Sequence, residues 1–61
     1  MKKYVEYERD MILLVKMGLQ SQMSAIDRCS AYLRAMVDFN IISEDRLSEE
    51  LRITTKKILE I

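Results

Sequence analysis

The chain has 61 residues, with ten basic and ten acidic side chains that balance to no net charge, and 49% of its residues are apolar. Balanced charge argues against a nucleic-acid binder, because such proteins usually carry a basic excess. A single cysteine and the lack of histidine exclude an internal disulfide and argue against a structural zinc ion. A domain of about 60 residues is marginally stable alone. We therefore expect a single small helical domain over residues 1–61 that associates with another chain.

The first predicted element is a long helix over about residues 4–38. Apolar residues occupy one heptad position throughout this segment: Val5, Ile12, Leu19, Ile26 and Leu33. The repeat keeps its phase across Gly18, which favours one continuous helix of roughly 50 Å. Gly18 and Ala25 occupy a neighbouring uncharged position, where small side chains let a second helix approach closely.

The alternative is a break at Gly18. The first element is then two helices, so the chain has three short helices in all. Glycine followed by an apolar residue is typical of a helix end, because glycine readily takes the left-handed conformation. Ser24 is then the candidate N-cap of the next helix, with Asp27 three residues later. A glycine inside a helix costs about 1 kcal/mol, which packing can offset, so we favour the continuous helix.

The second predicted helix covers about residues 44–60. Asn40 suits the left-handed position after a helix, and Ser43 is a good N-cap. Glu44 and Asp45 place negative charge in the first turn, where the helix dipole favours it. The predicted apolar face of this helix consists of Leu47, Leu51, Thr54, Ile58 and Ile61.

Together these elements predict an all-α helical hairpin whose second helix covers only about half of the first. The uncovered apolar segment predicts pairing of two hairpins into a homodimeric four-helix bundle with coiled-coil packing. The predicted interface for self-association or for another protein consists of Met11, Ile12, Val15, Gly18, Leu19, Gln22, Ile26, Cys29 and Leu33.

Two polar residues, Glu8 and Gln22, interrupt a heptad position that is otherwise apolar. We interpret Glu8 as lying at the edge of the apolar face, where its carboxylate reaches water. For Gln22, that interpretation and a role in fixing the register of the helices fit equally well.

The sequence predicts no catalytic residue, no metal site and no cofactor. Cys29 lies on the apolar face and has no histidine to activate it. The apolar run from Met11 to Leu19 is shorter than the roughly 20 residues that span a bilayer. The lone thiol and the absence of a recognisable cleavable leader indicate a reducing cytoplasm.

These observations favour a non-enzymatic protein–protein interaction module, namely a small cytoplasmic regulator, inhibitor or adaptor that acts through an apolar helical surface. A nucleic-acid-binding hairpin dimer with a regulatory role is the alternative. Its candidate contacts are Lys16, Arg28, Arg34, Arg52, Lys56 and Lys57. These residues are interleaved with acidic ones, so this alternative ranks second.

Overall fold

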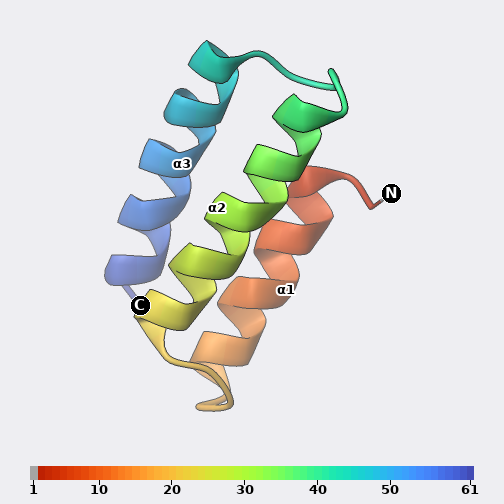
Figure 1. Cartoon of the computed structure of the whole chain (residues 1–61). Coiled ribbons are helices and arrows are strands. Elements are labelled where there is room, and N and C mark those ends of the chain that lie inside the picture. The colour runs from red at the N-terminus through yellow and green to blue at the C-terminus, as the bar shows by residue number, and fades with distance from the viewer. Residues whose placement is uncertain (1) are drawn as a thin grey trace.

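The computed structural model describes residues 2–61. In this part of the chain the elements are α1 (Tyr4–Lys16), α2 (Gln22–Asp38) and α3 (Glu44–Leu59). The helices run alternately in opposite directions (Figure 1), and together they form a three-helix bundle in which each helix contacts the other two. The all-α prediction is confirmed, and the chain adopts the three-helix alternative.

The single helix predicted over residues 4–38 is wrong, because the chain turns at Gly18. Gly18 has a φ of +73°, in the left-handed region. The N–H groups of Gly18 and Leu19 donate to the carbonyl oxygens of Val15 and Leu14 at 3.0 and 2.9 Å. These two bonds form a Schellman end, which satisfies carbonyls that the terminated helix leaves open. The turn also lets α1 and α2 bury their apolar faces against each other within one chain.

The cap of α2 also differs from the one expected. Ser21, rather than Ser24, is the N-cap, and its side chain accepts a hydrogen bond from the Ser24 N–H at 3.1 Å. Ser24 therefore supplies the N–H group that is capped. The N-cap thus lies three residues earlier than expected, and α2 begins at Gln22.

The predicted boundary between α2 and α3 is confirmed. Asn40 has a φ of +59° and forms a second Schellman end, with Ile41 N–H bonded to the Met36 carbonyl oxygen at 2.8 Å. Ser43 is the N-cap of α3 and accepts from the Arg46 N–H at 3.1 Å.

Gly18→Ala should lower the free energy of unfolding by about 1 kcal/mol, because a β-carbon is unfavourable at positive φ. A β-carbon at this position would meet no atom within 4 Å, so the loss arises from backbone conformation alone. Gly18→Asn is the control and should lose less, since asparagine tolerates this conformation. Urea melts at one protein concentration measure both values, and a gain in stability on Gly18→Ala would contradict the turn.

The core is formed by one face of each helix. Its buried apolar side chains are Tyr4, Met11, Ala25, Cys29, Leu33, Met36, Leu47 and Ile58. Both α1 and α3 pack chiefly on α2. Between α1 and α2, the rings of Tyr7 and Tyr32 stack with their centroids 4.1 Å apart. The predicted face of α3 is confirmed at Leu47, Thr54 and Ile58, which are buried, and Leu51 is half-buried. The prediction is wrong at Ile61, which lies beyond the end of α3 and is 45% exposed.

Candidate functional site: a groove and an apolar end

A groove with a volume of about 540 Å³ opens between α1 and α3, beside the α2–α3 loop. We call it the α1/α3 groove. It exists because α1 has 13 residues whereas α2 and α3 have 17 and 16. The last turns of α2 and the first turns of α3 therefore extend past the start of α1 (Figure 1). The apolar lining of the groove consists of Val5, Leu33, Met36, Ile41 and Ile42.

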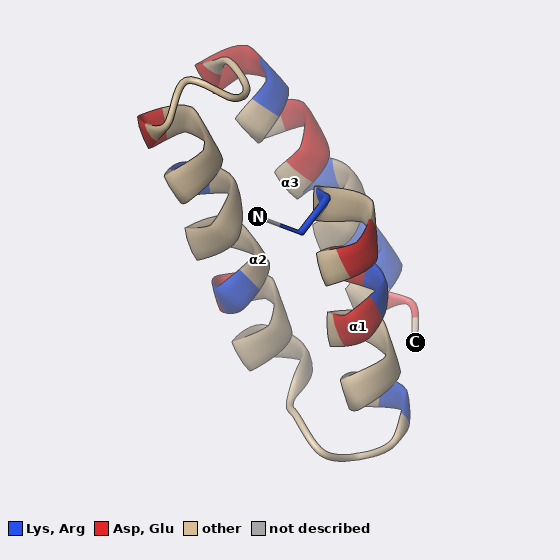
Figure 2. Cartoon of the chain, turned by 90° about the vertical axis from the view of Figure 1, so that its right-hand side faces the viewer, with Lys and Arg blue, Asp and Glu red and all other residues tan. Residues whose placement is uncertain are grey.

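Basic side chains lie on both sides of the groove. Lys2 and Lys3 line it next to α1, and Arg46 and Lys57 line it from α3. Figure 2 shows basic segments both before α1 and near the start of α3. Glu8 and Glu50 are the acidic residues of the lining, so basic side chains outnumber acidic ones.

Three of these four basic side chains already have an ion-pair partner in the chain. Lys2 Nζ lies 2.7 Å from Asp10 Oδ2, and this hydrogen bond raises the pKa of Lys2 and lowers the pKa of Asp10. In the Arg46–Glu50 pair the Arg46 side chain is exposed to water, which makes this ion pair a weak contact. Lys3 has no ion pair among residues 2–61.

A buried polar cluster, formed by Tyr4, Glu8 and Thr54, lies at the inner edge of the groove. The Thr54 hydroxyl donates to Glu8 Oε2, and the Tyr4 hydroxyl lies 2.5 Å from Thr54 Oγ1. Thr54 has one hydroxyl proton and uses it for Glu8, so Tyr4 donates to Thr54. Lys57 Nζ donates to Glu8 Oε1 at 3.1 Å from the groove side. The Glu8 carboxylate is therefore buried with both oxygens bonded.

Our interpretation of Glu8 as an edge residue is wrong, because its side chain is buried between α1 and α3. In the sequence, the sign that this position is unusual was a polar residue in an otherwise apolar heptad column. Only the threonine of α3 and the lysine one turn later explain why the carboxylate is tolerated there. Gln22 is half-buried, and its Nε2 donates to the Ile58 carbonyl oxygen at 3.1 Å, which joins the start of α2 to the end of α3.

Two ionisable side chains near the groove, Cys29 and Tyr4, are buried. Cys29 is fully buried, and burial raises the pKa of its thiol. Burial also raises the pKa of the neighbouring Tyr4 phenol. Both groups are thus neutral at physiological pH, and a neutral buried thiol is a poor nucleophile.

Two further features of residues 2–61 concern metal binding and membrane crossing. No group of three or more histidine, cysteine or acidic side chains there could hold a metal ion. Within the same residues, no helix combines the length and the apolar character needed to cross a membrane.

In the structure, some residues of the predicted interface lie in the core and others lie on the surface. Met11, Cys29 and Leu33 are buried within the chain. Half-buried positions are Ile12, Val15, Gln22 and Ile26, and only Gly18 and Leu19 are exposed. The division arises because the turn at Gly18 packs α1 against α2, so part of the face expected to meet another chain meets its own.

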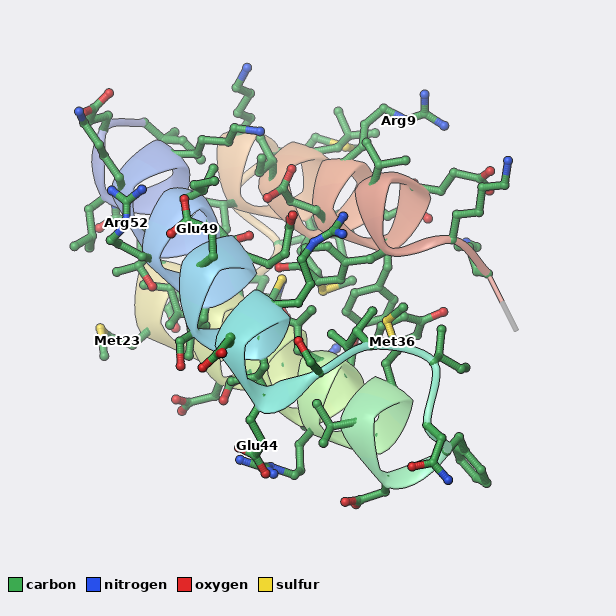
Figure 3. The ribbon with its side chains drawn as sticks, turned by 90° about the horizontal axis from the view of Figure 1, so that it is seen from above. Arg9, Met23, Met36, Glu44, Glu49 and Arg52 are labelled. Carbon is green, nitrogen blue, oxygen red and sulfur yellow. The ribbon has the colours of Figure 1, made fainter. Side chains whose placement is uncertain are left out.

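At one end of the bundle α1 ends, α2 begins and α3 ends (Figure 1), and five of the large exposed apolar residues belong to these helix ends or lie next to them. We call this the apolar end, and its residues are Met17, Leu19, Met23, Leu59 and Ile61. Met23 projects away from the bundle (Figure 3). Of these five residues, the predicted interface contained only Leu19. The others were missed because their exposure depends on how the three helix ends meet.

The six basic residues of the nucleic-acid alternative are all exposed but are spread over the three helices. Arg34 pairs with Glu44 at 2.8 Å, Arg52 with Glu49 at 2.9 Å, and Lys57 with Glu8. Arg52 and Glu49 lie side by side on α3 (Figure 3). Cations already neutralised by neighbouring carboxylates attract phosphates weakly.

No protein-family model, curated protein or solved structure matches the chain.

Proposed function

We propose that the chain is a non-enzymatic protein-interaction module, a small cytoplasmic regulator, inhibitor or adaptor, whose contact surface is the apolar end. The observation that carries this proposal is the exposure of five large apolar side chains at one end of the bundle. Large apolar side chains that are exposed together at one end of a small protein are typical of a protein-binding site. Met17 and Met23 suit such a surface, because methionine side chains adapt their shape to a partner.

The first partner that we propose is a second copy of the chain. A twofold dimer brings the same patch of each copy together, so one apolar surface is sufficient for both partners. Leu19 is 68% exposed and lies in the loop between α1 and α2, which places it where two bundle ends can meet.

Sedimentation equilibrium at micromolar concentration tests this proposal. The wild-type chain should sediment at twice the 7.2 kDa mass of one chain. Leu19→Asp should sediment as a monomer while keeping its helical circular dichroism, because the residue contributes little to the core. Phe39→Asp is the matched control: Phe39 is 69% exposed at the opposite end, and this variant should remain a dimer. A monomeric wild-type chain, or equal dissociation of both variants, would argue against pairing through the apolar end.

A further inference from the structure

We infer that Met17 and Met23 are modification sites, at which a hydroperoxide oxidises the apolar end and thereby switches off its association. The inference deepens the proposed function, on which it rests, by naming a regulator of the same surface. The two residues lie on either side of the turn between α1 and α2. Met17 is the C-cap of α1, and Met23 is the second residue of α2.

Exposure separates the methionines of the three helices and their ends into two pairs. Met17 and Met23 are 60% and 62% exposed. Met11 and Met36 are each 8% exposed, and Figure 3 shows Met36 among the helices. Gln20 Nε2 also donates to Met11 Sδ at 3.4 Å, which engages one of the lone pairs through which this sulfur would react. A hydroperoxide should therefore oxidise the two methionines of the apolar end well before the two buried ones.

The oxidation needs no catalytic group from the chain. With hydrogen peroxide, a lone pair of the thioether sulfur attacks one peroxide oxygen, an S–O bond forms and the O–O bond breaks. The transferred oxygen gives its proton to the leaving hydroxide, which departs as water. The peroxide thus gains two electrons, and the apolar thioether becomes a polar sulfoxide. Cys29 is a poor competitor for the peroxide, because it is fully buried and burial raises the pKa of its thiol.

Oxidation should change the surface of the bundle and leave its fold intact. The side chains of Met17 and Met23 lie outside the buried core. The backbone N–H of Met17 donates to the Leu13 carbonyl oxygen at 2.9 Å, a bond that does not involve the sulfur. In the proposed twofold dimer, each copy would bring two sulfoxides against the apolar surface of the other. Polar groups buried without hydrogen-bond partners are costly, so the dissociation constant of the dimer should rise at least about a hundredfold.

Association and oxidation should oppose each other. Two copies that pair through the apolar end cover Met17 and Met23, so peroxide should attack the unpaired chain faster than the dimer. Raising the protein concentration should therefore slow oxidation at these two sites and leave the rates at Met11 and Met36 unchanged. Leu19→Asp is the control, because this monomeric variant should be oxidised at the same rate at every protein concentration.

Timed exposure to hydrogen peroxide, followed by peptide mapping with mass spectrometry, reports each methionine separately. At low protein concentration, Met17 and Met23 should be oxidised about tenfold faster than the two buried methionines, because their sulfurs are accessible. Sedimentation equilibrium should show a dimer before oxidation and a monomer after it, with unchanged circular dichroism. Equal rates at the exposed and buried methionines, or a dimer that survives full oxidation of Met17 and Met23, would overturn the inference.

A double variant tests whether the two sulfoxides themselves cause the dissociation. Met17→Leu combined with Met23→Leu keeps both sites apolar and removes both sulfurs. The dissociation constant of this variant, whatever its value, should be the same before and after peroxide, and a rise would overturn the inference. A wild-type chain that is monomeric before peroxide would instead contradict the proposed dimer and remove the switch with it. The oxidation rates would still decide whether Met17 and Met23 are the modification sites.

Discussion

Leu33→Ala should lower the free energy of unfolding by about 2–5 kcal/mol, because removing a buried leucine loses its burial and leaves a cavity. Leu33 is fully buried on α2, the helix on which both other helices pack. Domains have about 0.05–0.15 kcal/mol of stability per residue, so the loss is a large share of what this chain can have. The variant should therefore melt at much lower urea concentration and can be partly unfolded without denaturant.

Leu19→Ala is the matched control for this experiment, since it is the same chemical change in the same heptad column. Leu19 is 68% exposed, so its truncation should change the unfolding free energy by no more than about 0.5 kcal/mol. Both variants are measured by urea melts at one low protein concentration, because association would add to the apparent stability. Similar losses for the two leucines would mean that they are equally buried and would contradict the fold.

Thr54→Val should destabilise the chain by about 1–3 kcal/mol, because it leaves the partners of a buried hydroxyl unsatisfied. Valine has nearly the shape of threonine, so packing is kept. Glu8 Oε2 loses its hydrogen-bond donor and the Tyr4 hydroxyl loses its acceptor. The part of the chain that the structure describes has no other buried side-chain nitrogen or oxygen without a partner, so this defect would stand alone.

Tyr4→Phe is the companion variant and should lose less, about 0.5–1.5 kcal/mol. It removes the first donor of the cluster but leaves the Thr54 hydroxyl bonded to Glu8. Urea melts of both variants compare the two hydrogen bonds in one cluster. If Tyr4→Phe were as destabilising as Thr54→Val, the hydroxyl of Thr54 would contribute nothing to holding Glu8.

The buried cluster matters for the groove as well as for stability. The hydrogen bond from Thr54 helps to keep the Glu8 carboxylate directed into the bundle, next to Lys57.

Local hydrogen bonding explains which parts of the fold were predictable from sequence. The start of α3 at Ser43 and the left-handed Asn40 depend on side chains and backbone groups a few residues apart. The helix end at Gly18 is equally local, and it was recognised as an alternative. The heptad repeat keeps its phase across Gly18 and therefore favoured one continuous helix over a helix end. Two separate helices can, however, each carry such a repeat.

The candidate site was harder to predict from the sequence, because its residues come from every helix and from a loop. Val5 and Ile41 line one groove only when α1 is placed against α2 and α3. The carboxylate of Glu8 marked an unusual position in the sequence, but its partners are more than forty residues away, on α3. Neither the groove nor the apolar end corresponds to one stretch of sequence.

Backbone capping and helical periodicity are sufficient to predict from the sequence that the chain is helical, where α3 begins, and that Leu47, Thr54 and Ile58 are buried. The full burial of Leu33 and the 68% exposure of Leu19, which lie in one heptad column, follow instead from how the three helices pack. The turn at Gly18 changes the direction of the chain between them. Burial depends on which surfaces meet after that turn, and the spacing of apolar residues along a helix carries no information about this.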